Sequence, residues 1–195
     1  MKKLVDIRQN RRTFIKTTAT GLAGMGFLSN CTGPVSTWRF FSGEEAKAMI
    51  ALAEQIVPAD DDPGATDAHV INFLDRQLVS HLKEYQELYR TGLQGLQELC
   101  MDRHNKKFED LPWDDQYEIL TDLENGRAEG KSWENIGPGY FFSTVRSHIM
   151  MGFYGPPRHG GNKNLVSYRM LGYDYPQVIG RNKNVSHESE IEESE

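Results

Sequence analysis

Of the six histidines in this chain, only His148 and His159 lie in the stretch richest in glycine, proline and aromatic residues. A histidine exchanges a proton near neutral pH, but as a general base it needs an orienting partner and a positioned substrate. Together with Arg158 and Asn162, the two histidines give one candidate active site, that of a stand-alone enzyme. The alternative is structural: a partly buried helix position for His148, and an interface or structural hydrogen bond for His159.

The stretch itself, from Gly152 to Tyr173, suits recognition better than catalysis. Glycine and proline can hold a loop in one shape, which lowers the ordering cost of binding. Aromatic residues and arginine dominate the energetics of protein interfaces. We therefore predict a surface that binds a partner, with these anchors: Phe153, Tyr154, Arg158, His159 and Asn162. The alternative is that the segment closes the domain, with its aromatic residues in the core.

The chain lacks the sequence motifs that hold cofactors, metals or nucleophiles. There is no Gly-x-Ser-x-Gly, phosphate loop, dinucleotide fingerprint, His-Glu-x-x-His or Cys-x-x-Cys-His. Cys31 and Cys100 are the only cysteines, too few for a disulfide framework or a cysteine metal site. The three aspartates 60–62 lack the spacing of a calcium loop and indicate a solvated turn. We expect no catalytic, cofactor-binding or metal-binding residue in this chain.

The elements that position these residues are predicted to be helices. Ser42 and Glu45 form a capping-box pattern, and apolar residues recur at helical spacing beyond it until Pro58. Four more helices are predicted: one from an N-cap at Thr66, one over 85–100, one from Leu111 with Tyr117, Leu120 and Leu123 inward, and one over 140–151. No alternation of β-branched residues occurs. The sequence therefore predicts one all-α domain of about five helices, residues 42–176, with an irregular Gly/Pro/aromatic C-terminal segment.

The two ends of the chain differ from this domain in their charge. The formal net charge is −6, yet residues 1–30 hold six Lys and Arg and one acid, so the rest of the chain carries a net −11. Such a body is a poor partner for nucleic acid or anionic lipid. Residues 177–195 are predicted to be an acidic disordered tail, because the apolar pattern fades and five glutamates follow residue 187.

Residues 1–30 resemble a twin-arginine export signal. Arg11 and Arg12 precede Phe14 and Lys16, and a weak apolar run follows that is too short to span a bilayer. The alternative is a basic amphipathic helix. Leu28 stands three residues before Cys31, as in a lipoprotein cleavage site, which predicts lipidation of Cys31 and a linker over 31–41. The alternative is ordinary cleavage nearby.

Three sequence elements together resemble the gluconate 2-dehydrogenase subunit 3 family, the small subunit of membrane-bound flavin-dependent sugar dehydrogenases. They occur in the family's order over roughly residues 40–176. The elements are Ile56–Asp60 with Pro63–Ala65; Phe73–Leu78 with Tyr89–Leu93; and Gly152–Gly155 with Pro157, Gly160–Asn162 and Leu171–Tyr173. Two positions depart from the family: Pro156 replaces an acidic residue, and Tyr168 stands where a tryptophan is common. The departures put the partner subtype in question.

The resemblance implies a non-catalytic subunit. The large partner would be a flavoprotein of the glucose-methanol-choline class that binds FAD, and a cytochrome c subunit with haem c would accept electrons. This chain would bind the flavoprotein and carry it through the twin-arginine translocase into the periplasm, tethered through Cys31. Gluconate 2-oxidation and glycoside 3-oxidation both stay open. The rival hypotheses are a stand-alone exported enzyme and a free-standing lipoprotein binding module.

Overall fold

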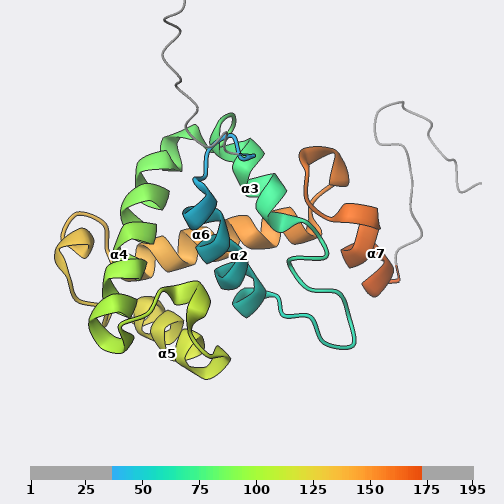
Figure 1. The fold of residues 1–195 in the computed structure, drawn as a ribbon. Helices are drawn as coiled ribbons and strands as arrows, with labels where there is room; N and C mark the ends of the chain where they lie inside the picture. Colours follow the sequence, from blue (N-terminus) through green and yellow to red (C-terminus); the bar gives the residue numbers. More distant parts are fainter. Residues whose placement is uncertain (1–36, 173–195) are drawn as a thin grey trace, which may run out of the picture. The chain divides into compact units, whose positions relative to one another are not determined.

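The computed structural model describes residues 37–172, which form one helical unit (Figure 1). Its α-helices are α2 (Gly43–Ile56), α3 (Val70–Leu78), α4 (Gln86–His104), α5 (Trp113–Glu124), α6 (Pro138–Tyr154) and α7 (Val166–Met170). No strand occurs in this range, so the all-α prediction is confirmed, and α2 to α6 are the five predicted helices. None of the described helices is long and apolar enough to cross a membrane. The export signal, Cys31 and the acidic tail lie outside the described residues.

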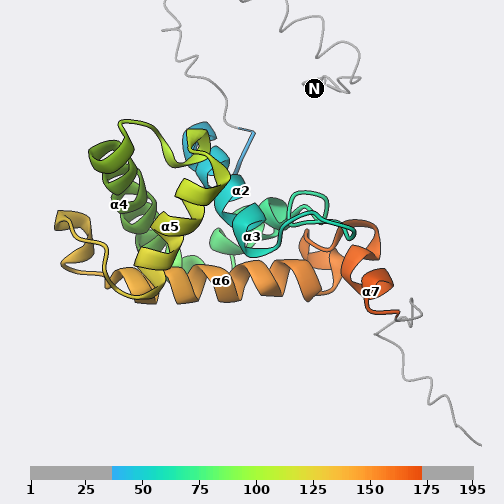
Figure 2. The ribbon, with the colours of Figure 1, turned by 90° about the horizontal axis from the view of Figure 1, so that it is seen from below.

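Helix α6 is the element against which the others are assembled. It contacts α2, α3, α4, α5 and α7, and Figure 2 shows it lying along one side of α2 to α5 with α7 near its C-terminal end. Its inward side consists of Phe141, Val145, Ile149 and Phe153, all fully buried. These residues recur at spacings of four, which places them on one helix face. One side of α6 is therefore core, and the other is available to solvent.

Close packing of α4 on α6 depends on a glycine. A Cβ atom on Gly92 would lie 2.1 Å from Cδ2 of the buried Phe141 ring, far inside contact distance. Cys100 lies on the same apolar side of α4, and burial raises the pKa of its thiol to about 12. It is thus the small buried hydrophobe that the sequence predicted.

The predicted start of the first helix is confirmed. The Ser42 hydroxyl accepts a hydrogen bond from the amide of Glu45 (3.2 Å), and the Glu45 carboxylate accepts one from the amide of Ser42 (2.7 Å). The backbone N–H groups of Ser42 and Glu45 have no acceptor within the helix, and each thereby gains a partner. The helix ends at Ile56, two residues before Pro58.

Two sequence predictions about the helices are wrong: one concerns a cap residue and the other a buried residue. Thr66 does not cap α3, which begins at Val70; instead its amide and hydroxyl donate to the Glu54 carboxylate of α2 (3.0 and 2.6 Å). Tyr117 does not face inward, since 65% of it is exposed. The buried position belongs to Gln116, whose amide group donates to the carbonyls of Phe108 and Leu111. A polar residue can lie in the core when its hydrogen bonds are satisfied. A pattern of apolar residues does not predict such a position.

Candidate docking surfaces

His148 is a core residue. Its Nδ1 lies 3.1 Å from the Tyr89 hydroxyl oxygen. The Tyr85 ring packs edge-on against the imidazole ring, with 4.8 Å between the two ring centroids. Burial lowers the pKa of His148 and raises the pKa of Tyr89, because both charged forms would lose solvation. No hydrogen bond within residues 37–172 joins His148 to Arg158, His159 or Asn162. Of the four candidate active-site residues, a hydrogen bond within residues 37–172 joins only Arg158 and His159.

Asn162 and Phe153 shape the C-terminal segment from inside. Asn162 is fully buried in a left-handed conformation (φ 45°), donates to the carbonyl of Gly155 (3.0 Å) and accepts from the amide of Ser167 (3.1 Å). Phe153 is 1% exposed. Both side chains are directed into the domain, so they act as supports of the segment and do not lie on its outer surface.

The other three predicted anchors lie at the surface. Tyr154 is 38% exposed, Arg158 is exposed and His159 is half-buried. Nε of Arg158 donates to Nε2 of His159 (3.0 Å). Within residues 37–172, no group of three or more His, Cys, Asp or Glu side chains is arranged to hold a metal ion. The outer part of the segment offers an aromatic ring and a guanidinium group, which suit recognition of another surface.

The solvent side of α6 forms an uncharged stripe, which we call the α6 stripe. Its residues recur at helical spacing: Tyr140, Ser143, Ser147, Met150, Met151 and Tyr154. Tyr140 is 59% exposed and Met151 52% exposed. Arg146, the exposed charged residue of α6, lies at the edge of this face and pairs with Glu124 of α5. The stripe runs about 21 Å along the helix, and such a long uncharged face suits contact with another protein.

A second surface is cationic and was not predicted. Arg39 and Arg76 line a hollow of about 320 Å³, and the other residues that line it are Thr37, Trp38, Asn72, Asp75 and Gly160. Arg158 and Lys163 stand on either side of Gly160 in the sequence, and a Cβ atom on Gly160 would lie 3.2 Å from Nη1 of Arg76. Lys163 Nζ is 3.0 Å from Nε2 of His69. We call Arg39, Arg76, Arg158 and Lys163 the cationic surface. Within residues 37–172, none of the four has a carboxylate within ion-pair distance.

Strained backbone accompanies the cationic surface. Five non-glycine residues of the described range have positive φ, and four of them are in or beside this region: His69, Asn162, Asn164 and Leu165. A leucine in the left-handed region, at φ 60°, is costly, because its Cβ crowds the backbone. Such conformations persist only where the surroundings enforce them, and they cluster at functional sites.

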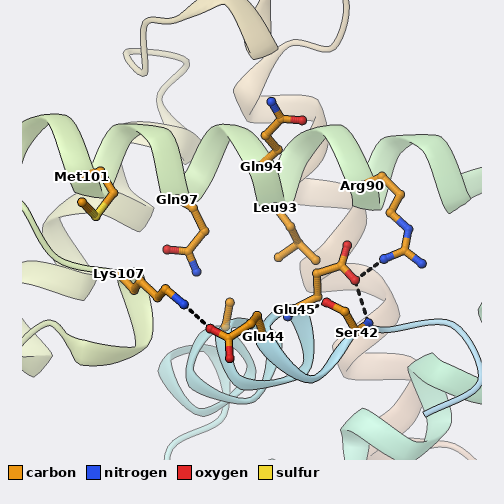
Figure 3. Close-up of a pocket in the computed structure, with 10 residues that line it drawn as sticks. Ser42, Glu44, Glu45, Arg90, Leu93, Gln94, Gln97, Met101 and Lys107 are labelled. Carbon is orange, nitrogen blue, oxygen red and sulfur yellow. Dashed lines mark hydrogen bonds and ion pairs between the residues drawn. The ribbon is translucent and has the colours of Figure 1, made fainter. Parts of the chain in front are cut away.

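The groove between α2 and α4 offers a contrast (Figure 3). It encloses about 510 Å³ above an apolar floor of Ala48, Leu93 and Met101. Figure 3 shows two ion pairs across it, Glu44 with Lys107 and Glu45 with Arg90. Lys107 lowers the pKa of Glu44. Burial raises the pKa of Glu45, but Arg90 and Ser42 together lower it below its ordinary value. The two carboxylates of this groove are thus paired with cations from α4 and the segment after it.

The family model described as Gluconate 2-dehydrogenase subunit 3 matches residues 43–174, more than half of the chain. The chain belongs to this family. No curated protein and no solved structure matches it. The family is that of an accessory subunit of a dehydrogenase, so the chain is part of an oxidoreductase complex.

The structure gives a physical role to two residues of the second gluconate 2-dehydrogenase subunit 3 element. The buried Asp75 carboxylate accepts hydrogen bonds from three successive amides, those of Arg39, Phe40 and Phe41, at 2.8 to 3.3 Å. Arg90 lies 4.2 Å over the Phe40 ring and donates to the Phe40 carbonyl. Both residues hold the segment 39–41, which the sequence predicts to be part of the linker.

The third element of the gluconate 2-dehydrogenase subunit 3 pattern brings the returning chain onto α6. A Cβ atom on Gly161 would lie 2.1 Å from the carbonyl oxygen of Gly152, so only glycine permits this approach. The amide of Lys163 then donates to the carbonyl of Ala68 (3.0 Å). Sequence reasoning missed Arg39, Arg76 and Lys163, because a charge count cannot show which cations gather. It also missed the α6 stripe, although the uncharged positions recur every three or four residues.

Proposed function

We propose that this chain is the non-catalytic small subunit of an FAD-dependent sugar or sugar-acid dehydrogenase of the glucose-methanol-choline type. It stabilises the flavoprotein and carries it through twin-arginine export. Family membership and the leader with Arg11, Arg12 and Phe14 support the proposal. FAD belongs to the large subunit and haem c to a third subunit, so the partner sets which carbon is oxidised.

The observation that carries the proposal is the α6 stripe. Interface cores are depleted in charged residues and enriched in tyrosine and methionine, and the stripe combines exposed Tyr140, Met150, Met151 and Tyr154 without a charge among them. A monomer gains little by exposing such residues on a helix that organises its core. We assign this face to the flavoprotein, with Arg158 and His159 at the rim of the contact.

The proposal extends to location. The leader directs the folded pair to the periplasm, and a lipidated Cys31 tethers it to the membrane. Residues 32–36 then join the lipid to the segment that Asp75 holds. A complex exported in the folded state needs its subunits to associate before translocation, which places the docking step in the cytoplasm.

The test replaces Arg11 and Arg12 with lysine in cells that also produce the flavoprotein. We expect periplasmic dehydrogenase activity to disappear, because both proteins stay in the cytoplasm, while the flavoprotein still co-purifies with this chain. Mass spectrometry of the exported wild-type chain should show a lipid on an N-terminal Cys31.

A double lysine variant with unchanged periplasmic activity would reject the carrier role. Failure of the flavoprotein to co-purify from wild-type cells would reject the subunit assignment and return the chain to the stand-alone hypotheses. An N-terminus elsewhere, or an unmodified Cys31, would reject the tether alone.

A further inference from the structure

Exposed methionines are concentrated on the face that we assign to the flavoprotein. Residues 37–172 hold five methionines, of which Met49 is fully buried and Met170 is half-buried. Met150 and Met151, 38% and 52% exposed, are consecutive residues of the α6 stripe. Met101, 44% exposed, lies instead at the groove between α2 and α4. Two of the three exposed methionines in this range thus belong to one surface.

An exposed thioether can be oxidised to a sulfoxide. In the reaction with hydrogen peroxide, a sulfur lone pair attacks one peroxide oxygen, an S–O bond forms and the O–O bond breaks. The sulfur loses two electrons, and the second oxygen leaves as hydroxide. The hydroxide then takes the proton of the transferred oxygen, which gives water. Met150 and Met151 are open to this reaction in the free subunit, whereas the core shields Met49.

We propose that Met150 and Met151 are a redox modification site, at which sulfoxide formation prevents the free subunit from docking on its flavoprotein. The inference rests on the proposed function, because it regulates the docking face assigned there. The oxidant is hydrogen peroxide. A reduced flavin without its electron acceptor makes hydrogen peroxide from dioxygen, so the assembled complexes are themselves a source of the oxidant.

The position of the two methionines makes the α6 stripe sensitive to this change. Met150 and Met151 precede Tyr154 by four and three residues, which places both beside it on the helix surface. A sulfoxide replaces a polarizable apolar group with a polar hydrogen-bond acceptor. When a partner covers that acceptor without supplying a donor, the lost solvation opposes binding. An uncharged contact around Tyr154 therefore weakens when either methionine is oxidised.

The same change leaves the fold intact, because neither methionine belongs to the core. The core face of α6 is formed by other residues, from Phe141 to Phe153, which are fully buried. A sulfoxide on the solvent side stays in water in the free subunit, and surface changes of this kind cost little stability. Enzymes that reduce methionine sulfoxide restore the thioether. The modification is therefore reversible and acts on docking alone.

The test treats the purified full chain with hydrogen peroxide, removes the peroxide with catalase, and then titrates the chain with untreated flavoprotein. Peptide mass spectrometry measures the oxidation of each methionine. We expect sulfoxide at Met150 and Met151 but not at Met49, and binding about tenfold weaker, the effect of one unsatisfied buried acceptor. Circular dichroism should show an unchanged melting temperature, and methionine sulfoxide reductase should restore the original affinity.

Two variants separate the α6 stripe from oxidation elsewhere. Met150→Leu/Met151→Leu keeps apolar side chains of similar volume. Whatever its affinity before treatment, that affinity should be the same after peroxide, because leucine is not oxidised. The matched control is Met101→Leu, which removes an exposed methionine outside the stripe. It should lose affinity on peroxide treatment as the wild-type chain does.

Equal affinities of the oxidised and untreated wild-type chain would overturn the inference. So would a loss of affinity in the peroxide-treated Met150→Leu/Met151→Leu variant, or protection by Met101→Leu. If the leucine variant binds too weakly to titrate, the reductase decides: affinity of the oxidised wild-type chain that does not return rejects the inference. Untreated wild-type chain that does not bind the flavoprotein at all rejects the proposed function instead, so the two failures are distinguishable.

Discussion

Acidic side chains have different partners at two ends of the domain. One end is built from α4 and α5, and the other lies around the cationic surface. At the α4–α5 end, acids pair with cations: Asp122 with Arg103 and Arg127, and Glu124 with Arg146. At the other end, Glu54 and Asp75 accept hydrogen bonds from backbone amides. Within residues 37–172, neither of these two carboxylates forms an ion pair with Arg39, Arg76, Arg158 or Lys163.

The difference shows how one chain divides stability from recognition. Exposed ion pairs contribute little to the free energy of folding, so their main effect at the α4–α5 end is to cancel charge. A buried carboxylate that accepts several amide hydrogen bonds fixes an irregular segment in one shape. The second end is therefore rigid and charged at once, which lowers the cost of binding an anionic surface.

The largest expected effect compares two neighbouring aromatic residues. Phe153→Ala should lower the free energy of unfolding by about 3–5 kcal/mol, because it leaves a cavity in the core. Tyr154→Ala should lower it by less than about 1 kcal/mol and weaken flavoprotein binding by about 2 kcal/mol or more. Urea unfolding and titration with the flavoprotein measure the two quantities. If Tyr154→Ala binds normally, the α6 stripe is not the docking face.

Asp75→Asn should produce the next largest effect. The amide keeps one acceptor oxygen but loses the charge that three backbone N–H groups share, at a cost of about 2–3 kcal/mol in unfolding free energy. Asp61→Asn is the control, since it removes an exposed carboxylate from the acidic turn and should change stability by less than about 0.5 kcal/mol. Equal effects in urea unfolding would mean that Asp75 does not hold segment 39–41.

The smallest effect separates the two ends directly. Arg103→Gln should cost about 0.2–1 kcal/mol of stability, through loss of its pair with Asp122, and leave flavoprotein binding unchanged. Arg158→Gln should leave stability unchanged and weaken binding by about 1 kcal/mol. Thermal unfolding and titration calorimetry of both variants give the comparison. A stability loss at Arg158 alone would show that the charge of that end serves the fold.

Much of the fold follows from local sequence. The capping box at Ser42 and the apolar spacing of α2, α4 and α6 are set by contacts within a few residues, so the sequence alone predicts those helices. The same holds for Cys100, which lies on an apolar stripe and is buried. The ordered elements from Ile56 to Tyr173 indicated the family, and the family match confirms it.

Only the tertiary structure decided where charges and aromatic rings lie relative to one another. A net charge of −11 for the body argues against nucleic acid and anionic lipid, yet folding brings Arg39 and Arg76 to one hollow from distant parts of the chain. Sequence composition cannot distinguish Phe153 from Tyr154, although the helix turns one into the core and the other into solvent. The physical reason is that a helix fixes only which residues share a face, whereas packing decides which face is covered.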